Sequence, residues 1–300
     1  TTTTTKRTTT ATETSERMTD NELSHFEDLP GILQICIGTA TKPGLIAYFD
    51  DDILAMINMF AKTCKKFLEY DPLRCYYFRV VLTKKYGVNF DGSRVNLNGK
   101  NIRDEDLQNI GEALKGNNTL TELVLRNNNI TDVQSIGELL KTNNTLEVLS
   151  LSNNNITDVQ SIGEALKTNN TLKELYLRDN NITDVQSIGE GLKTNSTLKT
   201  LNLSNNNITD VQSIGEGLKT NNTLTRLELY SNNITDVQSI GEGLKTNNTL
   251  KGLYLFYNNI TDDSGIQSII DGLKTNNTLH HLHLDNNQLS DNMKSQLKAI

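Results

Sequence analysis

The chain has 300 residues, a formal net charge of −7, only 5% aromatic residues and no Trp. The acidic excess lies after residue 90, where 18 Lys and Arg stand against 25 Asp and Glu, while the first 90 residues balance at 11 against 11. This distribution lacks the basic stripe that binding to a phosphate backbone needs, so we expect no nucleic-acid partner.

The first two segments differ in composition. Residues 1–20 are rich in Thr and almost free of apolar side chains, so they cannot bury enough surface to offset the entropy of ordering, and we predict a disordered tail. Residues 21–92 hold 11 of the Phe and Tyr residues, and residues 52–67 repeat apolar side chains at spacings of three and four. That spacing indicates amphipathic helices. We therefore expect an α-helical cap domain.

The cysteines and the hydropathy pattern indicate a compartment. Cys36, Cys64 and Cys75 all lie in the N-terminal part, are odd in number and lack metal-ligand spacing, so we expect reduced thiols. No apolar run has transmembrane length and no signal-peptide core is present at the N-terminus. We expect a cytoplasmic protein without membrane contact, whose Asn-x-Thr triplets never meet a glycosylating enzyme.

Residues 93–300 are dominated by an internal repeat. The tetrapeptide Asn-Asn-Thr-Leu, once as Asn-Ser-Thr-Leu, begins at positions 117, 143, 169, 195, 221, 247 and 276. Each copy continues as Leu-x-x-Leu-x-Leu-x-x-Asn-x-Ile, with Leu for Ile in the last. A poorer copy runs through Val95, Leu97 and Ile102, with Lys100 in place of the Asn. The total is eight, and a divergent first copy is typical of a capping repeat.

These motifs resemble the leucine-rich-repeat family over roughly 200 residues. Repeats of about 26 to 29 residues with a helical second half resemble its intracellular, ribonuclease-inhibitor-like subclass. The resemblance implies an α/β fold: a curved solenoid of about eight repeats, with parallel strands on the concave face and helices on the convex face. Strands stack about 4.8 Å apart whereas helices need about 10 Å, so the strands belong inside the curve.

Within one repeat, local signals place the strand and the helix. Leu123 and Leu125 alternate with outward positions, which predicts a short strand with one buried face. Thr131 followed by Gln134 three residues later predicts a capping box with Thr131 as the N-cap. Several helices contain two glycines, such as Gly189 and Gly191, each costing up to about 1 kcal/mol relative to Ala. We expect close approach of helix to strand to be the reason for them.

One Asn in each repeat must turn inward with the leucines. A buried amide is tolerated only when it is hydrogen-bonded, and the loop backbone of the adjacent coil offers partners. We therefore predict a structural ladder and not a ligand site. Its members are Asn128, Asn154, Asn180, Asn206, Asn232, Asn258 and Asn287.

The repeats vary where a partner would bind. Ile-Thr-Asp-Val-Gln-Ser-Ile-Gly-Glu is identical in five copies, whereas the outward strand positions differ from copy to copy. Every aromatic after Phe90 falls in or beside an outward column, and large rings and Arg are the usual anchors of protein interfaces. We predict a protein-binding patch towards the C-terminal end of the concave face. Its candidates are Tyr176, Arg178, Arg226, Glu228, Tyr230, Tyr254, Phe256, Tyr257, His281 and His283.

Simpler interpretations stand beside this one. Tyr tolerates half-exposed strands and can pack across its neighbours without any ligand. His281, His283 and Asp285 could hold Zn²⁺, but polar residues on a wet terminal repeat explain them more simply. The repeats contain no catalytic arrangement and no phosphate-binding loop of the G-x-x-x-x-G-K-[ST] type. We predict no metal, no cofactor and no enzymatic activity.

The N-terminal segment carries a second resemblance. Residues 29–30, 52–54, 64–67 and 71–73 resemble a degenerate F-box, although the spacer before residue 52 is too long and the usual Trp is missing. An F-box beside leucine-rich repeats implies a substrate adaptor of a cullin-type ubiquitin ligase. The ligase's linker subunit would then dock on residues 29–78. A plain helical cap over the apolar edge of the first repeat accounts for the same residues.

Three functions follow from these patterns. The first is a non-catalytic scaffold that binds a protein partner on the concave face. The second is the ubiquitin-ligase adaptor, and the third is a regulatory activator of a GTPase, as in other members of the subclass. We expect the chain to be a monomer.

Overall fold

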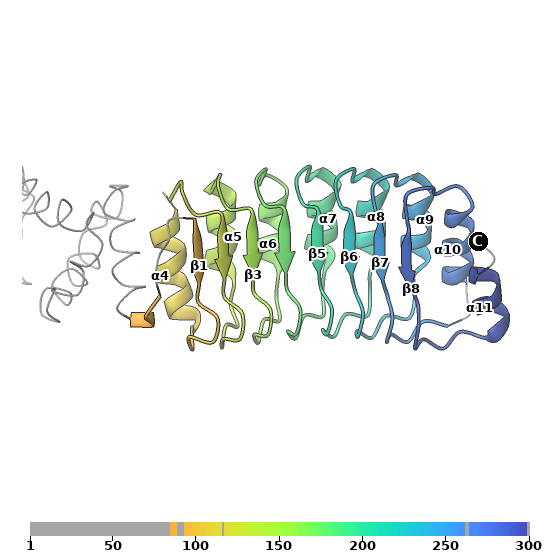
Figure 1. Ribbon diagram of the computed structural model, residues 1–300, viewed down its shortest axis with the longest axis horizontal. Coiled ribbons are helices and arrows are strands. Elements are labelled where there is room, and N and C mark those ends of the chain that lie inside the picture. Colours follow the sequence, from red (N-terminus) through yellow and green to blue (C-terminus); the bar gives the residue numbers. More distant parts are fainter. Residues whose placement is uncertain (1–84, 89–92, 116, 262–263, 299–300) are drawn as a thin grey trace, which may run out of the picture. The chain divides into compact units, whose positions relative to one another are not determined.

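The structure is a computed structural model that describes residues 85–88, 93–115, 117–261 and 264–298. The Thr-rich tail at 1–20 and the F-box-like segment at 29–78 lie outside the described residues. So does the cap domain predicted at 21–92, apart from residues 85–88. The repeats are described almost completely (Figure 1).

Strands and helices alternate along the described residues from position 94 onwards. The strands are three residues long: β1 (Arg94–Asn96), β2 (Glu122–Val124), β3 (Val148–Ser150), β4 (Glu174–Tyr176), β5 (Thr200–Asn202), β6 (Arg226–Glu228), β7 (Gly252–Tyr254) and β8 (His281–His283). The helices are α4 (Asp104–Leu114), α5 (Gln134–Thr142), α6 (Gln160–Leu166), α7 (Gln186–Thr194), α8 (Gln212–Thr220), α9 (Gln238–Thr246), α10 (Ser264–Leu273) and α11 (Asp291–Lys298). Each strand and the helix after it form one repeat.

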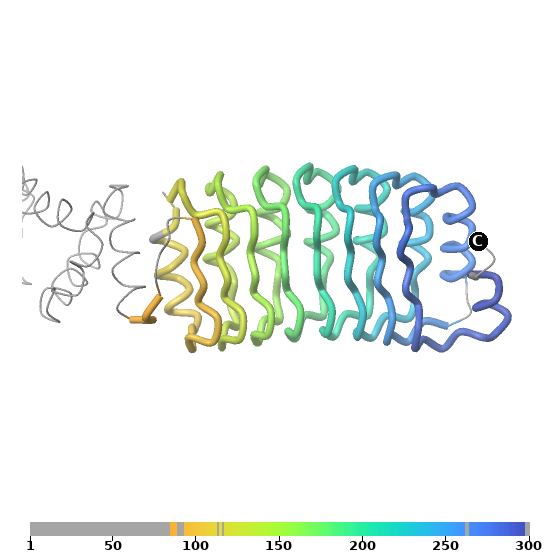
Figure 2. Tube along the Cα trace, viewed as in Figure 1, coloured from red at the N-terminus to blue at the C-terminus, as the bar shows by residue number. Residues whose placement is uncertain are grey.

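The strands form one parallel sheet in chain order, β1 to β8. The register is constant, so the central aliphatic residue of each strand, Val95 in β1 and Leu in the others, stands beside that of the next, as Leu201 beside Leu227. Figures 1 and 2 show the strands side by side on one face of the repeats and the helices behind them. The predicted curved α/β solenoid of eight repeats is therefore confirmed.

A continuous aliphatic core lies between the sheet and the helices. Each repeat contributes two strand-side leucines, such as Leu201 and Leu203, and helix residues such as Ile214 and Leu218, all with 0% exposure. No aromatic side chain is among the buried core residues of the described region. Because this core is repeated coil by coil, each repeat contacts its neighbours and holds the next strand in register.

The helix starts differ from the predicted capping box. Helix α5 begins at Gln134, with Val133 as its N-cap residue and no capping bond from Thr131. Asp132 Oδ1 instead accepts the backbone N–H of Gln134 at 2.7 Å, and the same bond recurs in the next four repeats at 2.7 to 2.8 Å. The chain stays non-helical through Val133, which places Thr131 too early to cap. Its hydroxyl donates to Asp104 of the preceding repeat.

The helix glycines also act differently from the prediction. A Cβ atom on Gly215 would lie 2.4 Å from the backbone oxygen of Ser239, and one on Gly217 would lie 2.8 Å from the oxygen of Gly189. These neighbours belong to the adjacent helices and not to a strand. The glycines therefore permit close helix–helix packing, which reduces the difference between helix spacing and strand spacing.

Candidate functional site

The asparagine column that follows strands β2 to β8 is hydrogen-bonded throughout, and six of its seven members are buried. Asn206 is 7% exposed, its Nδ2 donates to the carbonyls of Leu177 and Leu203 at 3.0 and 3.1 Å, and its Oδ1 accepts the N–H of Ile182 at 3.0 Å. The six other asparagines of this column make the corresponding bonds to their own strand's leucine and to the preceding coil. All the polar groups of the buried amide are satisfied, and none points to a ligand.

A second asparagine ladder was not predicted from the sequence, where the first Asn of the repeated tetrapeptide, such as Asn143, was given no hydrogen-bonding role. Asn195 is 4% exposed, and its Nδ2 donates to the carbonyls of Leu166 and Asn169 at 2.9 and 3.0 Å. Its Oδ1 accepts the backbone N–H of Thr197 and of Leu198. The signal was present in the sequence, because the first Asn of the Asn-Asn-Thr-Leu motif is repeated in every copy.

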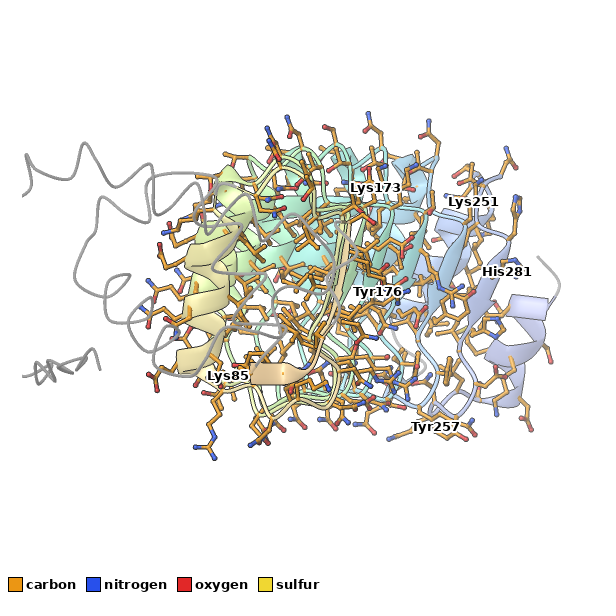
Figure 3. All side chains as sticks on the ribbon, turned by 60° about the vertical axis from the view of Figure 1, so that its left-hand side comes forward. Lys85, Lys173, Tyr176, Lys251, Tyr257 and His281 are labelled. Atoms are coloured by element: carbon orange, nitrogen blue, oxygen red, sulfur yellow. The ribbon has the colours of Figure 1, made fainter. Side chains whose placement is uncertain are left out.

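The outward side chains of the strands stand in columns across the concave face. The parallel register places Tyr176, Asn202, Glu228, Tyr254 and His283 beside one another at the third position of β4 to β8. Most of the predicted patch lies in this column or in the loop that follows it. Figure 3 shows Tyr257 at one edge of the repeats, and Lys173 and Lys251 at the opposite edge.

Five aromatic rings of the C-terminal repeats form a connected cluster. Tyr230 and Phe256 are stacked, with ring centres 4.3 Å apart and planes 8° from parallel. Tyr254 and His283 are stacked at 5.1 Å, also at 8°. Phe256 then contacts Tyr257 and His283 edge-on at 5.8 and 6.5 Å. We call Tyr230, Tyr254, Phe256, Tyr257 and His283 the ring cluster.

Two arginines extend the ring cluster towards the centre of the sheet. The Arg226 guanidinium lies over Tyr254, 4.5 Å from the ring centre, and Arg178 lies over Tyr230 at 5.7 Å. Arg178 also pairs with Asp179 at 2.9 Å. Cation–π contacts of this kind orient the guanidinium groups and leave further N–H donors available.

Tyr257 holds an unusual backbone conformation. Its φ angle is 53°, in the left-handed region, where the corresponding positions of the other repeats carry Asn, Asp or Ser. A bulky side chain in that region is strained, and such strain clusters at functional sites. Tyr257 is also the one large apolar side chain of the described residues that is highly exposed, at 58%.

Glu228 differs from the expected exposed position. It is only 8% exposed, accepts the Nδ2 of Asn202 at 2.6 Å and also accepts the Nε of Arg226. Asn202 is buried with it and accepts the hydroxyl of Ser204 at 2.6 Å. The hydrogen bond that Arg226 donates to Glu228 raises the pKa of Arg226, against the opposing effect of burial. Glu228 therefore organises Arg226 from beneath and offers little surface of its own.

Two other candidates lie at the margins. Tyr176 is half-buried and donates to Glu174 at 2.6 Å; burial raises the pKa of its hydroxyl, and the bond to that carboxylate raises it further. His281 is exposed on β8 and makes no ring contact with the cluster in the described part of the chain. His283 Nδ1 lies 3.9 Å from Asp285, and no group of three His, Cys, Asp or Glu among the described residues could hold a metal ion.

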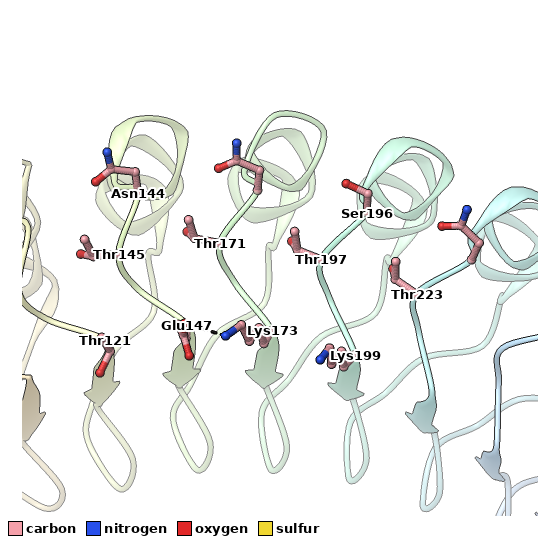
Figure 4. A pocket seen from close by; sticks show the side chains of 12 residues that line it. Thr121, Asn144, Thr145, Glu147, Thr171, Lys173, Ser196, Thr197, Lys199 and Thr223 are labelled. Atoms are coloured by element: carbon pink, nitrogen blue, oxygen red, sulfur yellow. Dashed lines mark hydrogen bonds and ion pairs between the residues drawn. The ribbon is translucent and has the colours of Figure 1, made fainter.

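A groove outside the predicted patch runs along the edge before the strands. It encloses about 690 Å³ and is lined by the threonines of successive Asn-x-Thr motifs, by a Glu147–Lys173 ion pair at 2.6 Å and by Lys199 (Figure 4). The Thr197 hydroxyl is buried there with no hydrogen-bond partner. The groove follows from the repeated loop shape, which sequence spacing does not reveal. No helix among the described residues has the length and apolarity to span a membrane.

Family models identify the repeats directly. A model of two leucine-rich repeats matches residues 144–190 and 170–216, and a model of a single leucine-rich repeat matches residues 116–133, 220–237 and 246–267. The chain therefore contains leucine-rich repeats, which commonly mediate protein–protein interaction. No curated protein matches the sequence significantly.

Solved structures with similar repeats come from varied proteins. Internalin C2 of Listeria monocytogenes is 26% identical with a TM-score of 0.47, over 66% of this chain and 74% of that one. The matching chain in the crystal structure of PEPR1-AtPEP1 is 24% identical with a TM-score of 0.49, over 69% of this chain and 27% of that one. The APL1 leucine-rich repeat domain is 20% identical with a TM-score of 0.41, over 66% and 56% of the two chains.

Proposed function

We propose that the repeats bind a protein partner on the concave strand face and that the ring cluster is the anchor. The observation that carries the proposal is Tyr257, a strained and 58% exposed tyrosine at the edge of stacked rings. A fold that needed only a turn there would be better served by Asn, which tolerates the left-handed region. Binding gives a reason for the ring.

The packing of the ring cluster favours binding. The stacked pairs Tyr230–Phe256 and Tyr254–His283 hold their rings in fixed orientations before any partner arrives. Ordering side chains at an interface costs about 0.5–1.5 kcal/mol for each flexible group, so preorganised rings lose less on binding. Arg178 and Arg226 at the border add oriented donors for polar groups of the partner.

The area of the face sets a limit on the partner. Eight strands about 4.8 Å apart span roughly 35 Å, and a length of about four residues along each strand and its ends adds roughly 13 Å, so the face presents roughly 450 Å². A standard interface buries about 800 Å² on each partner. A tight partner must therefore also contact the loops at one edge, where Tyr257 lies.

The test compares matched double variants in a capture experiment. Tyr254→Ala with Phe256→Ala removes two rings from β7 and the loop after it. Val124→Ala with Arg126→Ala changes the equivalent positions at β2 and serves as the control. We expect the β7 variant to weaken capture of the partner by at least about 2 kcal/mol, with the control unchanged and both melting temperatures near the wild type.

The same experiment separates binding from simple packing. If the rings serve only to pack across neighbouring strands, the β7 variant will lose stability and keep its capture. That result would contradict the proposal.

A second candidate is the F-box-type adaptor of a cullin ubiquitin ligase. Its support is the sequence resemblance at residues 29–78, and the repeats would bind substrate in the way proposed above. The adaptor predicts copurification of the ligase's linker subunit with the intact chain, and loss of that subunit on Ile53→Asp with Leu54→Asp. The absence of the linker from the wild-type purification would rule the adaptor out.

A further inference from the structure

Every full repeat carries Asn-x-Thr triplets in two columns. The first column contains the asparagines 129, 155, 181, 207, 233 and 259, and the second those at 117, 143, 169, 195, 221, 247 and 276. Asn-x-Thr is the acceptor sequence of N-linked glycosylation in secretory compartments. The structure exposes the asparagines of the first column and buries most of those of the second. This difference in burial bears on the compartment in which the chain can fold.

The first column is compatible with a glycan. Its asparagine side chains, such as those of Asn181 and Asn207, are exposed at the loop before each helix. Their backbone N–H groups bond to the preceding coil, and Asn129 also donates from Nδ2 to Asn101 Oδ1 of that coil at 2.5 Å, where both side chains are exposed. A sugar on these side chains would extend into solvent.

The second column is incompatible with a glycan. Asn195, Asn221 and Asn247 are each 4% exposed. Both Nδ2 hydrogens of Asn221 are donated, to the carbonyls of Leu192 and Asn195 at 2.9 and 3.0 Å. Asn195, Asn247 and Asn276 repeat the pattern at 2.7 to 3.0 Å, and Asn169 repeats it at 2.8 and 3.4 Å.

The chemistry of modification conflicts with these bonds. Glycan transfer forms a bond between Nδ2 and the first sugar carbon as the sugar–diphosphate bond of the lipid-linked donor breaks, and one Nδ2 proton is lost. The modified nitrogen keeps a single hydrogen, so one of two buried carbonyls loses its donor. The sugar would also occupy space filled by the neighbouring coil. Transfer reaches these sites before folding, because the folded column is inaccessible.

We infer that the chain folds in a compartment without N-glycosylation, because modification of the Asn195 column and formation of the repeats exclude each other. The inference is independent of the proposed partner binding. It rests on buried side chains within the described repeats, and it holds whatever residues precede or follow this sequence.

The experiment directs the full chain to two compartments of the same animal cells. One form is expressed in the cytosol, and the other carries an added signal peptide that delivers it to the endoplasmic reticulum. Glycan occupancy is mapped by mass spectrometry after enzymatic release, and folding is read from protease resistance and secretion. We expect a folded, unmodified cytosolic form, and a secretory form that carries glycans on the Asn195 column, is protease-sensitive and is not secreted.

Two matched variants identify the column responsible. Thr→Val at 119, 145, 171, 197, 223, 249 and 278 removes the acceptor sequence of the buried column and keeps its asparagines, and Ser204→Ala in the same variant removes that of the buried Asn202. Thr→Val at 131, 157, 183, 209, 235 and 261 removes that of the exposed column. Only the first set should restore a folded, secreted chain. An inhibitor of glycan transfer applied to the wild type should restore it too, which covers the case in which the multiple variant fails to fold.

Two results would overturn the inference. One is a folded, secreted wild-type chain, with or without glycans on the Asn195 column. The other is a misfolded secretory form whose buried column carries no glycan, because the failure would then have another cause.

Discussion

The Arg226 guanidinium lies over the ring of Tyr254 and donates from Nη1 to the hydroxyl oxygen of that residue at 3.2 Å. Its Nε donates to Glu228, which is 8% exposed. A single arginine thus joins a buried carboxylate on its own strand β6 to the ring cluster beginning on β7. The arrangement connects the stability of the concave face with its recognition surface.

Removing that arginine should therefore destabilise the repeats. Arg226→Ala leaves the Glu228 carboxylate buried with only the Asn202 amide, and an unsatisfied buried polar group costs about 1–3 kcal/mol. We expect the free energy of unfolding in urea to fall by a similar amount. Adding Glu228→Gln should recover part of the loss, because the uncompensated charge is gone. Equal stability of Arg226→Ala and the wild type would refute the connection.

Each buried asparagine of the ladder should contribute strongly to the free energy of unfolding. Asn206→Ala removes four hydrogen bonds and leaves the Leu177 carbonyl and the Ile182 N–H buried without the amide. We expect a loss of about 2–4 kcal/mol in urea unfolding. The neighbouring Asn207→Ala, at an exposed side chain, is the matched control and should change stability by less than about 0.5 kcal/mol.

The glycines predict a position-dependent response to alanine. Gly215→Ala would bring a Cβ to 2.3 Å from the backbone carbon of Ser239, so the helices must move apart at a cost of about 1–3 kcal/mol. Gly111→Ala meets its nearest atom at 3.1 Å and gains up to about 1 kcal/mol of helix propensity. The melting temperature of Gly111→Ala should be well above that of Gly215→Ala. The reverse order would show that helix packing does not set the spacing.

Acid should weaken the connection between the first two repeats. Burial opposes ionisation of Asp104, but hydrogen bonds from the Thr131 hydroxyl and from the N–H groups of Thr131 and Asp132 outweigh it, so the pKa of Asp104 is lowered from its ordinary value. A lowered folded pKa adds stability above the unfolded pKa of about 3.9, and this stability disappears as pH falls through the folded value.

Asp104→Asn should consequently lose less stability than the wild type between about pH 6 and pH 3. Glu105→Gln, at an exposed carboxylate beside it, is the control. Urea unfolding at the two pH values provides the measurement. Identical pH dependence of Asp104→Asn and the wild type would contradict the account.

The repeat itself could be predicted from sequence because its core is periodic. Leu123 and Leu125 are buried, and the register carries the same pattern into every strand. The spacing of the leucines in the sequence predicts these buried positions, and the prediction does not depend on the conformation of the loops. The helix start was predicted wrongly, because Thr131 and Asp132 are both common capping residues. Only the backbone path, which stays non-helical to Val133, selects Asp132.

Positions that depend on a neighbouring repeat were the hardest to predict. The glycines face the next helix, a relationship between coils that one repeat's pattern does not contain. Glu228 was expected to be exposed because its column points outward, yet Arg226 and Asn202 cover it. Burial on the concave face depends on which side chains adjoin, and these side chains vary from strand to strand. The binding role of the predicted patch remains a prediction.

Tyr257 tests the central claim most directly. Tyr257→Asn puts at φ 53° a residue that tolerates this conformation, and relief of the strain is worth about 1 kcal/mol. The measurement is the affinity for the captured partner, with the melting temperature recorded beside it. If the ring is held there for binding, affinity falls by at least about 1 kcal/mol while the melting temperature stays the same or rises. Unchanged affinity in a variant at least as stable as the wild type would contradict a concave binding site anchored at these rings.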